Sequence, residues 1–200
     1  MNATGGGLGC LDGLGSLGSL GNDAGHQGDP GHLGHPVFAV RTATLAEAEA
    51  IHMLINGHVE DGHLLPRRRD EIAVHASRFV VALDEDRVIG CADLAPLSRT
   101  VAEVRSLVVS EDARSLGVGR RIVDELVRRA TLAGFEKLCA FTHSASYFVQ
   151  MGFSIVPQIW VPEKIETDCH NCAHFRRCGR YAVILPLSRT PHVPLASLHG

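Results

Sequence analysis

The sequence predicts an α/β domain with a mixed central sheet of about six to seven strands, flanked by about four helices. Two observations lead to this prediction. Short apolar runs rich in β-branched residues alternate with segments whose apolar residues recur at three- and four-residue steps. In the middle of the chain, a strand, a glycine loop, a long helix and another strand follow one another. That order predicts a β-α-β crossover and therefore two parallel strands in an otherwise antiparallel sheet.

The chain of 200 residues divides by composition into one domain and two tails. Residues 1–36 contain 12 of the 21 glycines and neither lysine nor arginine. We expect a disordered tail there, because such a segment has little apolar surface to bury. A second flexible tail is predicted at residues 188–200. The domain between them, residues 37–187, is long enough for a well-buried core and carries an insertion with three cysteines at 162–178.

Composition excludes several classes of partner. The net charge of −3 gives no basic surface for nucleic acid. No apolar stretch approaches the roughly 20 residues that span a membrane. Six cysteines without an export signal favour reduced thiols or a metal site over a disulfide framework. We therefore expect a cytoplasmic protein that binds neither nucleic acid nor a membrane.

The first half of the domain predicts a strand, two helices and an antiparallel meander. Residues 37–41 alternate apolar and polar side chains, as a strand does. Thr44 lies three residues before Glu47, the spacing of a capping box, and predicts a helix through about Asn56. A shorter helix is expected over 70–76. The meander is predicted from three apolar runs, at 79–83, 88–94 and 102–109.

The second half begins with the glycine loop and a strongly periodic helix. Apolar residues recur at helical spacing from Val118 to Ala130, and Gly134 is a suitable terminator. The remaining predicted elements are a strand at 138–141, a helix at 144–151 and a last strand at 181–187.

The glycine loop, residues 114–119, has the composition of an anion site. Backbone N–H groups and the positive end of the dipole converge at a helix start. Gly117 and Gly119 allow a phosphate to approach the backbone, and Arg114 and Arg120 add positive charge. The alternative is an ordinary strand–helix turn, since Gly-x-Gly alone is a weak signal. The loop has neither the Gly-Lys-Ser/Thr of a P-loop nor the acidic partner of a dinucleotide fold.

Two motifs together resemble the GNAT superfamily of N-acetyltransferases. Arg-x-x-Gly-x-Gly, between a strand and a long amphipathic helix, is similar to the family's acetyl-CoA signature. The run Tyr-Phe-Val-Gln-Met-Gly-Phe at 147–153 is similar to its second signature. Within the superfamily, the chain most resembles the short N-acetylglutamate synthases, which lack an amino-acid-kinase domain. This likeness rests on residues 64–71, 102–109 and the cysteine-bearing segment after Val161.

The resemblance implies acetyl-CoA as co-substrate and direct attack of an amine on the thioester in a ternary complex. The backbone at 107–109 should pair with pantetheine and donate an N–H group to the thioester oxygen. The backbone at 116–120 should hold the pyrophosphate. The implied cofactor-binding residues are Leu107, Val108, Val109, Arg114, Leu116, Gly117, Val118, Gly119, Arg120 and Phe148.

An α-ammonium group must lose a proton before it attacks, so the reaction requires a base, directly or through water. Glu103 matches the family's acidic position; the alternative is a solvent-facing carboxylate. Many GNAT enzymes have a tyrosine acid where this chain has Phe148. Tyr147 is one residue earlier and is expected to point elsewhere. The proton for the leaving thiolate would then come from Thr142, from Ser144 or from solvent.

The resemblance implies L-glutamate as acceptor, amino-acid N-acetyltransferase activity in arginine biosynthesis, and possible homodimer formation. The two carboxylates of glutamate favour arginine forks. Arg67, Arg69 and Arg105 are the candidates, with Arg180 in addition; the alternative for 67–69 is a solvated loop. Two other functions stay open: acetylation of another small amine or amino acid, and a non-catalytic acyl-CoA-binding regulatory module.

The insertion contains a candidate metal site. Cys169 and Cys172 are spaced as a two-ligand clip, and Cys178 and His174 lie nearby. A structural zinc or iron ion is one interpretation. The spacing is irregular for a zinc site, so free thiols in a packed loop or a redox-labile pair are the alternatives.

Overall fold

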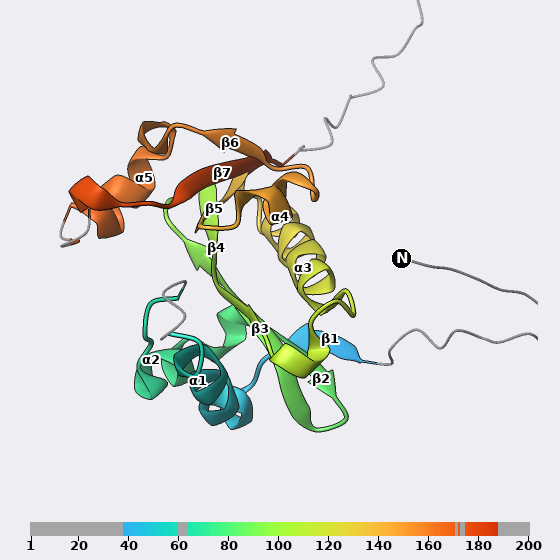
Figure 1. The fold of residues 1–200 in the computed structure, drawn as a ribbon. Coiled ribbons are helices and arrows are strands. Elements are labelled where there is room, and N and C mark those ends of the chain that lie inside the picture. The colour runs from blue at the N-terminus through green and yellow to red at the C-terminus, as the bar shows by residue number, and fades with distance from the viewer. Residues whose placement is uncertain (1–37, 60–63, 171, 173–174, 188–200) are drawn as a thin grey trace, which may run out of the picture. The chain divides into compact units, whose positions relative to one another are not determined.

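The computed structural model describes residues 38–59, 64–170, 172 and 175–187, so the tails predicted at 1–36 and 188–200 lie outside the described residues. The described residues form a seven-stranded sheet in the order β1-β2-β3-β4-β5-β7-β6, with helices on both faces (Figure 1). Strands β4 and β5 are parallel, and the other neighbouring strands are antiparallel. The mixed α/β sheet predicted from the sequence is confirmed.

The first half of the domain contains the predicted strand, helices and meander. The capping box forms: Thr44 accepts a hydrogen bond from the Ala46 N–H group, and the Glu47 carboxylate accepts one from the Thr44 N–H group at 2.6 Å. The first turn is a 3-10 helix. The elements are β1 (Ala39–Thr42), η1 (Leu45–Glu47), α1 (Ala48–Asn56), α2 (Arg69–Val74), η2 (Ala76–Arg78), β2 (Phe79–Asp84), β3 (Arg87–Pro96) and β4 (Val101–Val109).

The second half adds one strand that was not predicted. Strand β6 has three residues, too few to show an alternating pattern, and it is fixed by pairing with β7. A π-helical turn, η5, continues the short helix α5. The elements are η3 (Glu111–Ala113), α3 (Val118–Leu132), β5 (Lys137–Thr142), α4 (Ala145–Val149), β6 (Ser154–Val156), η4 (Gln158–Trp160), α5 (Pro162–Lys164), η5 (Ile165–Cys169), η6 (Phe175–Arg177) and β7 (Tyr181–Pro186).

Helices cover both faces of the sheet, α3 and α4 on one and α1 and α2 on the other (Figure 1). On the first face, Ile122 and Leu126 of α3 belong to the same core as Val80 of β2. On the second, Ile51 and Ile72 pack with Phe79. Because both faces of β2 are covered, its residues 79–83 are all buried, which explains their continuous apolar run.

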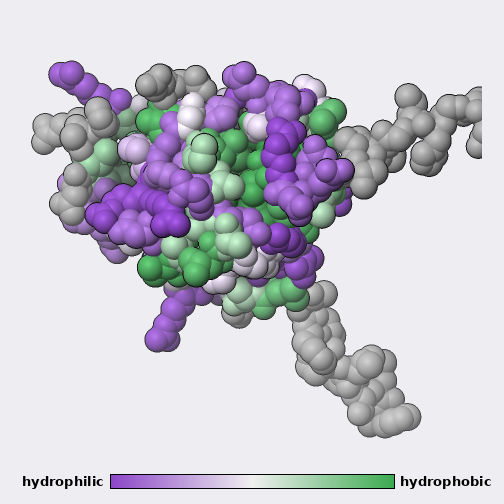
Figure 2. Space-filling view, turned by 90° about the horizontal axis from the view of Figure 1, so that it is seen from below, coloured by the Kyte–Doolittle hydropathy of each residue, from purple (hydrophilic) through white to green (hydrophobic). Residues whose placement is uncertain are grey.

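The outer surface is mixed in polarity. Seen from below, polar side chains cover much of the face and apolar side chains gather in smaller patches between them (Figure 2). Within the described ranges, the structure has no helix with the length and apolar character needed to cross a membrane.

Candidate active site

Strand β4 is distorted at Ser106, whose φ angle of 52° lies in the left-handed region. Between the pairs Cys91–Val108 and Asp93–Arg105, β4 has two residues, Ser106 and Leu107, against one residue of β3, so Ser106 lies within a β-bulge of β4. On its other side, β4 pairs with β5 only as far as Val104 and Ala140. Within the described sheet, the rest of β4 therefore has no partner on β5. The two strands therefore separate after Val104 and Ala140.

A cavity of about 730 Å³ lies at this separation. Its wall comes from the ends of β4 and β5, the glycine loop and α4. Leu116 is 46 % exposed and is not among the described residues that line the cavity. The other candidate cofactor residues all contribute to the wall: Leu107, Val108, Val109, Arg114, Gly117, Val118, Gly119, Arg120 and Phe148.

The glycine loop has the geometry of an anion site. Gly117 caps α3 with a φ angle of 80°, a conformation that glycine adopts without steric cost. The Arg121 N–H group donates to the Gly117 carbonyl at 3.1 Å, and the preceding N–H groups of the first turn have no acceptor within a helix. Arg114 and Arg120 are exposed and make loose ion pairs with neighbouring carboxylates, at 3.7 and 4.0 Å. Both guanidinium groups thus remain accessible to an anion at the helix start.

Tyr147 corrects one expectation from the sequence. It lines the cavity instead of pointing elsewhere, and its hydroxyl lies against Gly119. Burial raises the pKa of Tyr147, so the hydroxyl remains a hydrogen-bond donor at neutral pH. Two histidines that the sequence analysis did not single out, His58 and His143, also line the cavity.

The two hydroxyl candidates for the acid lie together at the end of β5. Thr142 and Ser144 both line the cavity, and the Ser144 N–H group donates to Thr142 Oγ1 at 2.9 Å. This bond fixes the turn between β5 and α4. It therefore places both hydroxyl-bearing residues at the edge of the cavity.

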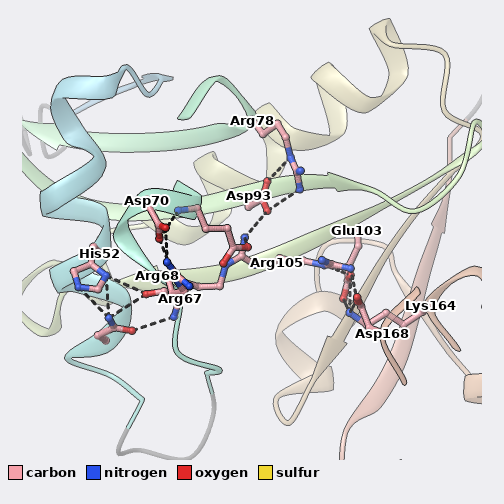
Figure 3. Close-up of polar contacts among 12 residues, drawn as sticks. His52, Arg67, Arg68, Asp70, Arg78, Asp93, Glu103, Arg105, Lys164 and Asp168 are labelled. Atoms are coloured by element: carbon pink, nitrogen blue, oxygen red, sulfur yellow. Dashed lines mark hydrogen bonds and ion pairs between the residues drawn. The ribbon is translucent and has the colours of Figure 1, made fainter. Parts of the chain in front are cut away.

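On the face covered by α1 and α2, a buried carboxylate gathers two arginines (Figure 3). Asp93 of β3 is fully buried and accepts hydrogen bonds from Arg78 at 3.1 and 3.0 Å and from Arg67 at 3.4 Å. Burial raises the pKa of Asp93, and the two guanidinium groups limit the rise. The Nε–H group of Arg67 is buried and has no acceptor among the described residues. Arg67 also forms an ion pair with Glu71 at 2.8 Å, so its Nε–H group is the buried donor of this side chain that lacks an acceptor in the described part of the chain.

A second network joins β4 to the segment after β6 (Figure 3). Glu103 is 3 % exposed, which rules out the solvent-facing alternative. Its carboxylate accepts hydrogen bonds from Arg105 and from Lys164 Nζ, the latter at 2.8 Å. Asp168 binds the same two cations. Burial alone would lower the pKa of Arg105, but the carboxylates of Glu103 and Asp168 outweigh this effect and raise it.

The two remaining candidate arginines lie apart from these networks. Arg69 is exposed and forms an ion pair with Glu49 of α1. Arg180 is half-buried, and its carbonyl accepts a hydrogen bond from Gln158 at 2.8 Å. The next residue, Tyr181, pairs with Thr142, which places Arg180 beside the end of β5. Arg180 therefore lies near the cavity, and Arg69 lies on the outer surface of α2.

The cysteine segment does not form a metal site in the described residues. Cys169, Cys172 and Cys178 carry free thiols, and the described residues contain no group of three or more His, Cys, Asp or Glu side chains placed to hold a metal. Burial raises the pKa of Cys169, which disfavours the thiolate that a metal requires. His174 lies outside the described residues. The zinc or iron interpretation thus has no complete ligand set here.

Comparisons with known proteins identify the family. Residues 45–153 match the model of the acetyltransferase (GNAT) family. The chain belongs to this family. An uncharacterized N-acetyltransferase from Chlorobaculum tepidum is 33% identical to this GNAT protein over 148 residues, which cover 74% of the chain and 96% of the relative.

Other relatives are named for amino-acid substrates but are longer. An amino-acid acetyltransferase from Neisseria meningitidis is 28% identical over 149 residues, 74% of this chain and 33% of the relative. The N-acetylglutamate synthase from Neisseria gonorrhoeae, solved with coenzyme A and N-acetyl-glutamate, has a TM-score of 0.69 at 24% identity. That alignment covers 76% of this GNAT chain and 36% of the synthase. The chain thus spans about a third of these proteins, and the structural likeness shows a shared fold.

Proposed function

We propose that this GNAT protein transfers the acetyl group of acetyl-CoA to the α-amino group of L-glutamate, as an amino-acid N-acetyltransferase of arginine biosynthesis. The observation that carries the proposal is the double role of β4. Its end, residues 107–109, lines the cavity, and its side chains Glu103 and Arg105 belong to a charged network just before the bulge. A cofactor site and an acceptor site are thus joined along one strand.

Acetyl-CoA in this proposal lies in the cavity between β4 and β5. The end of β4 has backbone groups without a partner on β5 in the described sheet, and these bind pantetheine and the thioester oxygen. The start of α3 binds the pyrophosphate, with Arg114 and Arg120 neutralising its charge. The Neisseria gonorrhoeae synthase of the same fold, solved with coenzyme A, supports this assignment.

The acceptor in this proposal lies on the side of Arg67 and Arg105. A carboxylate oxygen of glutamate supplies the acceptor that the Nε–H group of Arg67 lacks among the described residues. Arg180, beside the end of β5, is the third candidate. The named activity of the Neisseria meningitidis relative supports an amino-acid substrate.

Glu103 is the proposed base and the Ser144 or Thr142 hydroxyl the proposed acid. Of the described residues, those that line the cavity do not include Glu103, so the α-ammonium proton reaches its carboxylate through water. The amine then attacks the thioester carbonyl, the C–S bond breaks, and the nitrogen releases its second proton to solvent as the amide forms. The leaving thiolate takes its proton from the hydroxyl at the end of β5, which solvent restores.

Thiol release from acetyl-CoA tests this function. The purified protein is assayed with L-glutamate, with L-aspartate, L-glutamine and other small amines, and without acceptor, and the product is identified by mass spectrometry. We expect glutamate-dependent release of thiol and formation of N-acetylglutamate. Turnover of another amine in place of glutamate would assign a different GNAT substrate. Binding of acetyl-CoA with no turnover of any amine would assign a regulatory module.

A further inference from the structure

The segment formed by α5 and η5 contributes two charged side chains to β4. Lys164 and Asp168 lie four residues apart, and Lys164 Nζ contacts Asp168 Oδ2 at 2.7 Å. The same Oδ2 atom accepts a hydrogen bond from Arg105 Nη2. One carboxylate oxygen therefore bridges two cations, which is the position that a ligand carboxylate would occupy.

The four members of this network are buried to different degrees. The side chain of Glu103 is 4% exposed, that of Lys164 13% and that of Arg105 22%, whereas Asp168 is 39% exposed. Asp168 is therefore the member of the network with the most contact with solvent. Displacement of its carboxylate from the two cations costs the least free energy. Its departure would leave two cations facing one carboxylate, an excess positive charge that favours another anion.

The network also adjoins the cavity. Lys164 Nζ lies 5.5 Å from the ring centroid of Phe141, a residue that contributes to the cavity wall. Arg105 lies in β4 between Val104 and Ser106, which both line the cavity. The pair of cations thus lies where β4 and β5 begin to separate, beside the expected position of the thioester.

We propose that Lys164 and Arg105 bind the side-chain carboxylate of the acceptor amino acid, and that Asp168 is a resident carboxylate which the acceptor displaces. The proposal rests on the proposed function and names the substrate class, a dicarboxylic amino acid. Exchange of one carboxylate for another keeps the charge of the network balanced. A neutral side chain cannot make this exchange without leaving a cation unpaired, and for that reason it is discriminated against.

Steady-state kinetics with glutamate and glutamine test the specificity. Lys164→Met is expected to raise KM for glutamate by about tenfold, the effect of one lost charged contact, and to change KM for glutamine little. Asp168→Asn is expected to lower KM for glutamate several-fold. Lys137→Met and Asp86→Asn are matched controls, since Lys137 is the other lysine of the chain and both residues are exposed.

Two kinetic results would overturn the proposal. An equal rise in KM for glutamate and glutamine in Lys164→Met would make Lys164 a structural residue. A rise in KM for glutamate in Asp168→Asn would show that Asp168 holds Lys164 and Arg105 in place and is not displaced by the acceptor. Lys164→Arg, which keeps the charge, is expected to recover part of the affinity, and thermal unfolding confirms that each variant folds.

Binding of glutarate separates this proposal from the proposed function, because glutarate has two carboxylates and no amine to acetylate. Calorimetry on the CoA-loaded protein should give the tightest binding for Asp168→Asn, then wild type, then Lys164→Met. This order would support the subsite even if no amino acid were acetylated. Equal affinity in all three proteins would overturn it, whatever the turnover assay shows.

Discussion

The hydroxyl of Tyr147 occupies the space beside Gly119 in which a Cβ atom would stand. Helix α4 therefore closes against the first turn of α3, and any side chain at position 119 must move the tyrosine ring. Tyr147 is half-buried and lines the cavity, so the contact is relieved by displacement of its ring. The second glycine of the loop is thus required by the packing of Tyr147 and, in the proposed function, by the approach of a phosphate.

Gly119→Ala separates these two requirements. The variant is expected to lose about 1–3 kcal/mol of unfolding free energy through overpacking, and to bind CoA more weakly. Adding Tyr147→Phe removes the oxygen and leaves Cζ at 3.4 Å from the new Cβ, an acceptable contact. Urea denaturation should then show stability recovered relative to Tyr147→Phe alone, while calorimetry shows CoA affinity still reduced. Recovery of both would mean that the Cβ does not obstruct the phosphate.

The substitution Asp93→Asn, which replaces the buried carboxylate with an amide, should destabilise the fold. The change removes the buried counter-charge that Arg67 and Arg78 share, while Arg67 keeps its ion pair with Glu71 at 2.8 Å. Loss of one partner from a buried pair costs about 3–5 kcal/mol. Arg78→Gln should cost less, because the Arg78 side chain is 29% exposed and Arg67 still faces Asp93. Urea denaturation measures both, with the exposed hairpin residue Asp84→Asn as control. A loss of less than about 1 kcal/mol of unfolding free energy for Asp93→Asn is what exposed ion pairs give. That result would contradict the role of Asp93 as a buried counter-charge.

The positive φ angle of Ser106 predicts which substitutions this position tolerates. Ser106→Gly should be tolerated, because glycine adopts a positive φ angle freely. Ser106→Val should lose about 1–2 kcal/mol of stability, the penalty of a left-handed conformation, with a lower kcat where the end of β4 is displaced. Ser154→Val on the edge strand β6 serves as control. Unchanged kcat and stability in Ser106→Val would show that the bulge does not depend on this residue.

Arg67 and Arg69 allow a test with an internal control. Arg67→Gln is expected to raise KM for glutamate by about tenfold, because one charged contact is lost. Arg69→Gln should leave KM unchanged, because Arg69 is exposed and paired with Glu49. Equal effects of the two substitutions on KM would contradict the assignment of Arg67 to the acceptor side. Circular dichroism confirms folding, which matters because Arg67 also faces Asp93.

The elements that the sequence predicted well are those fixed by local interactions. Helix α3 follows from its apolar period and its glycines, and Gly134 after it has a φ angle of 83°. The capping box at Thr44 depends on residues within one turn. Strand β2 could be located because both of its faces are covered. The contacts of the capping box lie within one turn. For α3 and β2, the order of apolar residues along a few neighbouring positions was enough to predict the element.

The parts of the site that could not be predicted from the sequence depend on contacts between distant segments. Arg105 and Asp168 are 63 residues apart, and no local pattern predicts their pairing. Arginines two residues apart also look alike in a sequence, yet Arg67 turns inward to Asp93 while Arg69 turns outward to Glu49. Arg67 precedes the helix, whereas Arg69 is the first residue of α2 after the extended N-cap Arg68, so the backbone directs the two side chains differently.

Glu125 on α3 gives a prediction of acid stability. Hydrogen bonds from Arg128, with burial opposing and Arg129 assisting, lower the pKa of Glu125 from 4.5 to about 2. A carboxyl group whose folded pKa is depressed contributes stability above its unfolded pKa and loses it as the pH falls through the folded value. Its contribution should therefore be complete above pH 4.5 and decline toward pH 2. Thermal unfolding of the wild type and Glu125→Gln should show a smaller loss of Tm over this window in the variant. Parallel curves would mean that the ion pairs of Glu125 do not contribute to stability.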